Sequence, residues 1–246
     1  MDGDLLVRAG CGGLVGLVVG SFVATLVVRW PQRRSLTGRS ACDACGSRLG
    51  IAELVPLLSF LWQRGRCRHC GARIDPVHTV AELACAGVGA LALALVAGWP
   101  ALAGAMFGWV AVALTLLDLR RFWLPDALTL PLLAGGLALG PAPAAERFLA
   151  AALAGGFLLA VAGLYRVWRG RDGLGLGDVK LAAAVGSWLS PVLLPPLLLL
   201  ASLAGLGLAI RNRERLSRGG WQTRVPFGAC LAPAAWLLWL ASAAGR

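Results

Sequence analysis

The sequence predicts an all-α polytopic membrane protein of about eight transmembrane helices, with a cytoplasmic zinc-ribbon-like loop between helices one and two. Three observations predict this class. Hydrophobic residues make up 58% of the chain and charged residues only 14%, whereas a soluble domain carries roughly a quarter charged residues. The apolar residues form long runs without a polar stripe, which disfavours a soluble helical bundle. Two Cys-x-x-Cys pairs lie in the first polar segment.

The basic residues predict the orientation of these helices. Of the 23 Lys and Arg residues, 20 fall in four segments: 29–73, 120–121, 166–180 and 211–224. Basic loops stay cytoplasmic, so we expect all four on one side. The net charge of +11 therefore indicates topology and contact with the lipid bilayer, not nucleic acid. Asp2 and Asp4 precede the first apolar run and arginines follow it, the reverse of a signal peptide, so we expect a retained span with its N-terminus outside.

The apolar runs place the spans in order along the chain. The predicted spans are about 10–28, 78–97, 101–118, 124–140, 148–167, 178–190, 192–210 and 225–243. Prolines separate several of them, at Pro100, at 141–143 and at Pro191. Eight spans place the basic segments on one side and the proline turns on the other.

The loop after the first span carries a metal-binding pattern. Cys42 and Cys45 form one Cys-x-x-Cys knuckle, and Cys67 and Cys70 form the other. A glycine follows each knuckle and helps to close the turn. Two such pairs supply the four thiolates that structural zinc prefers, and they leave no open coordination position. We therefore expect a structural zinc ion; the alternatives are unligated thiols or a redox pair.

Two aspartates stand at predicted span ends. Asp118 closes the third span, and Asp178 opens the sixth after the glycine-rich stretch 173–177. Two carboxylates at one depth can share a proton and activate water against a peptide carbonyl, which is aspartyl protease chemistry. The residues alone leave other interpretations open, since Asp178 can cap a helix and Asp118 can pair with an arginine. Asp126 competes as a partner in the dyad.

An ordered set of motifs resembles the bacterial type IV prepilin peptidases, also called type IV leader peptidases. Besides the two cysteine pairs, the motifs are Gly-Ser-Phe at 20–22, Glu-Leu-Val-Pro-Leu-Leu-Ser at 53–59, 64–70, Glu82, Asp118, Leu-Pro-Asp at 124–126 within 124–131, Gly-Leu-Gly-Asp-Val-Lys-Leu at 175–181 and Pro-Phe-Gly at 226–228. The resemblance spans nearly the whole chain. Each motif is weak by itself, but the ordered set is very specific.

The resemblance implies a multi-pass protease of the bacterial inner membrane with its active site facing the cytoplasm. Such enzymes cut the basic leader from prepilins and pseudopilins, and many then N-methylate the new terminus with S-adenosylmethionine. The family's catalytic pair falls on Asp118 and Asp178, and Asp126 matches a non-catalytic position. The division that follows is 1–29, the first transmembrane helix; 30–77, the cytoplasmic zinc-binding loop; and 78–246, the transmembrane aspartyl protease core. We expect Gly175 and Gly177 to admit an extended substrate and Glu53, or Asp172, to contact the basic leader.

Three positions depart from the family pattern. Asp43-Ala44 replaces a proline-containing knuckle, Ala24 stands where an asparagine is common, and Leu54 replaces an asparagine. Two of these departures lie in the cysteine-loop half, which the resemblance links to methyl transfer, so a peptidase without methyltransferase activity is one alternative. A non-catalytic zinc-ribbon scaffold of a pilus or secretion system is another. A small-solute transporter is disfavoured because its acids would lie near mid-span.

Overall fold

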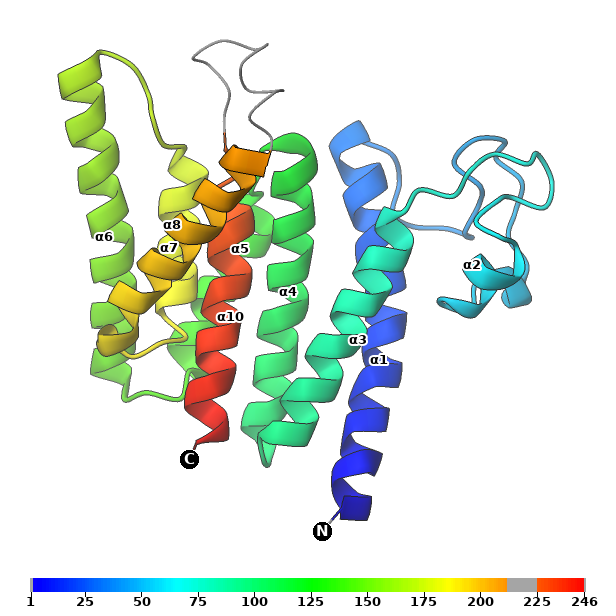
Figure 1. The fold of residues 1–246 in the computed structure, drawn as a ribbon, viewed down its shortest axis with the longest axis horizontal. Coiled ribbons are helices and arrows are strands. Elements are labelled where there is room, and N and C mark those ends of the chain that lie inside the picture. Colours follow the sequence, from blue (N-terminus) through cyan, green and yellow to red (C-terminus); the bar gives the residue numbers. More distant parts are fainter. Residues whose placement is uncertain (1, 212–224, 246) are drawn as a thin grey trace. The chain divides into compact units, whose positions relative to one another are not determined.

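The computed structural model describes residues 2–211 and 225–245, which fall into two units, Met1–Ala94 (unit 1) and Leu95–Arg246 (unit 2). Every regular secondary-structure element in these residues is a helix (Figure 1). The β-pairing in them is limited to two isolated bridges, Ala41 with Arg48 and Arg66 with Arg73. The predicted all-α fold is therefore confirmed. The predicted basic loop at 211–224 lies outside the described residues, apart from Arg211.

Unit 1 consists of two long helices joined by the cysteine loop. Its elements are α1 (Asp2–Arg29), η1 (Trp30–Gln32), η2 (Ile51–Glu53), α2 (Leu58–Trp62) and α3 (Val77–Leu95). The guanidinium of Arg29, at the end of α1, donates to the carbonyl of Ala41 at 2.8 Å and lies 3.3 Å from Asp43 Oδ1. Asp43, one of the departures from the family pattern, thus ties the first cysteine knuckle to α1.

A stripe of glycines brings α1 against α3. Gly12, Gly16 and Gly20 stand four residues apart and share one face of α1. A Cβ at Gly12 would run into the backbone of Gly89, and one at Gly16 into the backbone of Cys85. Small residues at this spacing let two helix backbones approach closely, which is a common packing device of membrane helices.

Unit 2 is a bundle around the short helix α7. Its elements are α4 (Trp99–Arg121), α5 (Asp126–Leu139), α6 (Ala144–Arg169), α7 (Leu176–Gly186), η3 (Pro191–Leu193), α8 (Leu194–Arg211) and α10 (Gly228–Ala244). Helix α7 packs against α5, α6 and α10, and α10 also packs against α4 and α8 (Figure 1). The bundle therefore places the start of α7 and the start of α10 next to the end of α4.

Aromatic residues fill the interior of unit 2. Phe107 of α4 stacks on Trp188 with ring centroids 4.8 Å apart and meets Trp239 of α10 edge-on at 6.4 Å. Trp188 follows α7, which ends at Gly186 rather than near residue 190 as the sequence predicts. Beyond α7 the backbone continues in i→i−3 turns, with Trp188 N–H donating to the Val185 carbonyl and Leu189 N–H to the Gly186 carbonyl. The Trp188 indole N–H donates to the Leu132 carbonyl at 2.9 Å, which joins this segment to α5.

The long helices have the length and composition of membrane spans. Five segments of the described chain meet both criteria: Gly3–Gln32, Val77–Leu95, Trp99–Arg121, Ala144–Arg169 and Pro191–Arg211. Helices α5 and α10 are apolar but shorter. Large apolar side chains such as Phe157 and Leu164 of α6 stand exposed, as lipid-facing residues do. The chain is thus a multi-pass membrane protein; each predicted span coincides with a helix, and the number eight stays a prediction.

Candidate active site

Asp118 lies in the last turns of α4, within unit 2. Its side chain is only 4% exposed, and its Oδ2 accepts a hydrogen bond of 2.8 Å from the backbone N–H of Ala229. Helix α4 ends three residues later, at Arg121, and Phe122 then adopts a left-handed conformation with φ 50° and ψ 42°. The neighbouring Arg120 and Arg121 are exposed. A carboxylate buried at a helix end and held by a main-chain donor is costly to place, which marks a functional group.

Asp178 lies in the first turn of α7. The preceding glycines form an extended entry to the helix, with Gly175 as the N-cap at ψ 143°. The backbone N–H of Asp178 donates to the Gly175 carbonyl at 3.1 Å, and its side chain is partly buried. The main-chain turn therefore fixes the position of this carboxylate. Because Gly175 is the N-cap residue of α7, Asp178 is not its helix cap.

Gly228, the first residue of α10, is where the two carboxylates meet. A Cβ built on Gly228 would stand 3.1 Å from Asp118 Oδ2 and 3.2 Å from Asp178 Oδ1. Both oxygens therefore lie within 3.2 Å of one point, although the aspartates come from different helices. The same Cβ would also stand 2.8 Å from Leu124 Cδ1. Sequence reasoning did not name Gly228 as a site residue; the signal was the Pro-Phe-Gly motif that ends there.

Asp126 has a different partner. Both of its carboxylate oxygens accept hydrogen bonds from Lys180 Nζ, at 2.9 and 2.8 Å. Lys180 stands two residues after Asp178 on α7, so this ion pair joins α5 to α7. Both side chains are about half exposed. The structure brings Asp118, and not Asp126, to Gly228 together with Asp178.

The two glycines predicted to contact substrate lie next to Asp178 and Leu124. A Cβ on Gly175 would lie 3.4 Å from Asp178 Oδ2, and one on Gly177 would lie 3.3 Å from the Leu124 side chain. Side chains at these positions would thus narrow the space beside the carboxylates. Asp172, the other predicted leader contact in this stretch, is exposed and lies 3.5 Å from Arg166 Nε.

The four predicted metal ligands gather in unit 1. The Sγ atoms of Cys42, Cys45, Cys67 and Cys70 all lie within 4.8 Å of one another. Each knuckle is closed by a glycine N–H that bonds to the first cysteine's carbonyl at 2.9 Å, and both glycines adopt positive φ, near 70°. Four sulfurs that each bind zinc at about 2.3 Å lie within about 4.6 Å of each other. The cluster therefore fits one tetrahedral metal ion.

The thiols of this cluster favour a bound cation. The Ser47 hydroxyl, 3.2 Å from Cys45 Sγ, and the Ser47 backbone N–H lower the pKa of Cys45 to about 6. Although the Ala72 N–H lowers it, burial and the three neighbouring sulfurs raise the pKa of Cys70 to about 11. Four sulfurs this close share negative charge poorly, and a divalent metal ion neutralises that charge.

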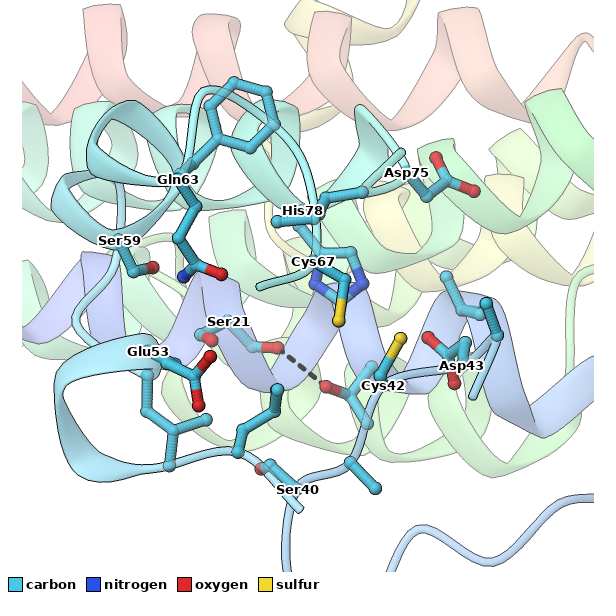
Figure 2. A pocket seen from close by; sticks show the side chains of 18 of the residues that line it. Ser21, Ser40, Cys42, Asp43, Glu53, Ser59, Gln63, Cys67, Asp75 and His78 are labelled. Atoms are coloured by element: carbon cyan, nitrogen blue, oxygen red, sulfur yellow. Dashed lines mark hydrogen bonds between the residues drawn. The ribbon is translucent and has the colours of Figure 1, made fainter. Parts of the chain in front are cut away.

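A pocket of about 390 Å³ opens in unit 1 beside the cysteine cluster. Its wall includes residues of α1, of both knuckles and of the first turns of α3, and Figure 2 shows Glu53, Gln63 and His78 among them. Glu53, the third predicted substrate contact, therefore lines this pocket. Glu82 lies in the same wall with only 6% of its surface exposed. Sequence reasoning quoted Glu82 as a motif residue but assigned it no role.

Comparisons with known proteins match both units. Residues 14–96 match the family model of the bacterial peptidase A24 N-terminal domain, and residues 105–210 match that of the type IV leader peptidase family. A prepilin leader peptidase/N-methyltransferase of Aeromonas hydrophila is 40% identical over 220 residues, which cover 85% of this chain and 74% of that protein. One of the same description from Burkholderia pseudomallei (strain K96243) is 37% identical over 253 residues, covering 89% of this chain and 81% of its own.

A third relative carries a different description. The type 4 prepilin-like proteins leader peptide-processing enzyme of Escherichia coli O78:H11 is 33% identical over 244 residues, which cover 88% of each chain. No solved structure matches this chain significantly.

Proposed function

This chain belongs to the type IV leader peptidase family, and from that membership we propose that it removes the leader peptide from prepilins or pseudopilins with Asp118 and Asp178 as the catalytic pair. The observation that carries the assignment is the approach of both carboxylates to Gly228, each within 3.2 Å of the same point. Asp126 is held by Lys180 instead, which supports leaving it outside the catalytic pair.

The reaction follows from two carboxylates that share one proton. The ionised carboxylate takes a proton from water, and the water oxygen attacks the carbonyl carbon of the scissile peptide. The protonated carboxyl group donates a hydrogen bond to the carbonyl oxygen and so stabilises the charge that develops there. The leaving nitrogen takes up a proton as the carbon–nitrogen bond breaks. Burial of Asp118 supports this chemistry because electrostatic interactions strengthen where water is excluded.

Gly175 and Gly177 are our proposed points of backbone approach for the substrate, since neither carries a side chain beside Asp178. The acidic residues Asp172 and Glu53 were predicted to contact the basic leader, and this stays a prediction. The exposed setting of Asp172, paired with Arg166, is compatible with a mobile basic partner because exposed ion pairs are weak.

We assign the four-cysteine cluster to a structural zinc ion. Cys42, Cys45, Cys67 and Cys70 would fill its four positions, and the bound ion would stabilise a loop with little core of its own. Among the described residues of this loop, Cys67 is buried but few large apolar side chains are. A closed four-sulfur shell supports a structural rather than a catalytic role.

N-methylation of the new terminus is the second activity we propose. The names of the relatives pair the peptidase with an N-methyltransferase, and residues 14–96 match the N-terminal domain of the family. S-adenosylmethionine would supply an electrophilic methyl group. Its fit is supported by the pocket of unit 1, where Glu53 Oε1 is buried without a hydrogen-bond partner among the described residues.

We propose the bacterial inner membrane as the location, with both sites on the cytoplasmic side. The clustering of arginines in the loops supports this orientation. In the cysteine loop, α2 leaves Leu58, Leu61 and Trp62 exposed, and Arg68 lies 5.5 Å over the Trp62 ring. An exposed apolar helix with a tryptophan and an arginine suits the headgroup region of a bilayer.

The test is leader cleavage by full-length protein in membranes, with labelled S-adenosylmethionine present so that leader loss and methyl incorporation are read separately. Asp118→Asn and Asp178→Asn should each abolish cleavage, while Glu146→Gln, an exposed carboxylate of α6, should not. Full cleavage by either aspartate variant would refute the dyad. If neither aspartate variant has any effect and only substitutions of the cysteines impair function, the chain acts as a non-catalytic scaffold.

A further inference from the structure

The pocket of unit 1 is built for a small molecule. Its volume of about 390 Å³ falls in the range of roughly 300–1,000 Å³ that ligand sites occupy. Every lining residue belongs to residues 21–82, so the pocket lies wholly inside unit 1. Leu49, Phe60 and Ile74 supply apolar surface. In Figure 2 the Gln63 amide and the Glu53 carboxylate point toward each other across the pocket.

The charge of the pocket is opposite to that of the protein. Four of the 12 acidic residues of this basic chain line it: Asp43, Glu53, Asp75 and Glu82. Two arginines, Arg29 and Arg73, also line it. Asp43 is already paired with Arg29 and Arg34, so Glu53, Asp75 and Glu82 remain against Arg73. An acid-lined hollow with apolar walls raises the local concentration of cations. An excess of acidic side chains therefore favours a positively charged ligand in this pocket.

Two buried side-chain atoms in the wall have no hydrogen-bond partner within the part of the chain that the structure describes. Glu53 Oε2 accepts a 2.8 Å hydrogen bond from the Gly50 N–H, which fixes the side chain, but Glu53 Oε1 is buried with no partner among the described residues. Thr79 Oγ1 is in the same situation. A buried polar atom left unpaired is destabilising, so a ligand that donates hydrogen bonds here would remove that cost.

Glu82 adds a second fixed carboxylate. It is 6% exposed, and its Oε2 accepts a 2.8 Å hydrogen bond from the Leu57 N–H. That bond ties α3 to the segment that carries Glu53. The two glutamates thus hold their positions before any ligand arrives, which lowers the entropic cost of binding.

We propose that this pocket is the S-adenosylmethionine site, with Glu53 as the contact for the positively charged part of the methyl donor and Thr79 as a second polar contact. This inference rests on the proposed N-methyltransferase activity and gives it a location. It also assigns Glu53 a ligand other than the basic leader.

The test measures binding directly, with full-length, zinc-loaded protein in detergent and labelled S-adenosylmethionine in equilibrium dialysis. The wild type should bind about one equivalent. Glu53→Gln keeps an oxygen for the Gly50 N–H but removes the charge, and it should raise Kd about 10-fold to 100-fold. Thr79→Val, which keeps the side-chain shape, should raise Kd several-fold. Glu146→Gln in unit 2 should bind like the wild type, and zinc content and melting temperature report folding.

Leader cleavage in the same samples separates this inference from the peptidase. Asp118→Asn should bind S-adenosylmethionine normally while it fails to cleave. If the wild type cleaves but does not bind S-adenosylmethionine, the pocket assignment fails and the peptidase stands. Unchanged affinity in Glu53→Gln would also overturn the assignment: a raised KM for cleavage would then assign Glu53 to the leader, and a raised KM for a pre-cleaved acceptor peptide would assign it to the substrate amine.

Discussion

Replacing Gly228 with alanine should strongly lower the kcat/KM of leader cleavage while leaving the fold intact. The new Cβ would stand 3.1 Å from Asp118 Oδ2, 3.2 Å from Asp178 Oδ1 and 2.8 Å from Leu124 Cδ1. A Cβ contact of 3.0–3.4 Å is tighter than ordinary van der Waals contact, and one under 3.0 Å requires a neighbour to shift. Each carboxylate must therefore retreat by a few tenths of an ångström, and Leu124 by more. The φ of Gly228 lies outside the left-handed region, so the backbone itself accepts alanine.

The size of the effect follows from that displacement. A misplacement of about 1 Å in a catalytic site costs about 100-fold in rate. A smaller shift of both carboxylates should lower kcat/KM about 10-fold to 100-fold, equivalent to about 1.4–2.7 kcal/mol of transition-state stabilisation. The assay is leader cleavage by purified full-length protein at several substrate concentrations, with melting temperature measured on the same samples.

The control is another glycine of unit 2. A Cβ on Gly207 of α8 meets nothing within 4 Å, so Gly207→Ala should leave cleavage unchanged and stabilise the helix by up to about 1 kcal/mol. If Gly228→Ala retained activity within twofold of the wild type, the two carboxylates would not act together at this point, and the geometric basis of the dyad would be wrong.

Three further predictions concern the supports of the two sites. Lys180→Met should lower kcat/KM about two- to fivefold, since exposed ion pairs contribute at most about 1 kcal/mol; Asp126→Lys combined with Lys180→Asp should restore it in the cleavage assay, and failure of this swap would count against a positioning role. Cys67→Ser should reduce bound zinc, measured by metal analysis, from one equivalent to below half, and a variant that keeps a full equivalent would contradict the four-sulfur site. Gly16→Ala should destabilise the packing of α1 on α3 by about 1–3 kcal/mol, seen as a lower melting temperature, whereas Gly10→Ala, where a Cβ meets nothing within 4 Å, should not; equal melting temperatures would argue against the close helix approach.

Local pattern was enough for the helices and for the cysteine cluster. Long apolar runs and prolines predicted most of the long helices to within a few residues, although α1 begins at Asp2 rather than near residue 10. The spacing of Cys42, Cys45, Cys67 and Cys70 anticipated sulfurs that lie within 4.8 Å of one another. These features are set by residues near one another in the chain. The sequence predicts the end of this span near residue 190, and α7 ends at Gly186 with i→i−3 turns that continue to Leu189. The bond from Trp188 to the Leu132 carbonyl is a contact that no local pattern encodes.

The composition and ordered motifs by themselves determined a membrane-embedded member of one family, with two candidate acids and a four-cysteine loop. Only the tertiary structure brought Asp118, Asp178 and Gly228 to one point, paired Asp126 with Lys180, and enclosed an acidic pocket around Glu53 and Glu82. The physical reason is that helices apolar on every face carry no stripe to say which neighbour they pack against. Which helices pack together depends on the shapes of their surfaces, including the glycines that allow close approach. The site forms only where α4, α7 and α10 pack together.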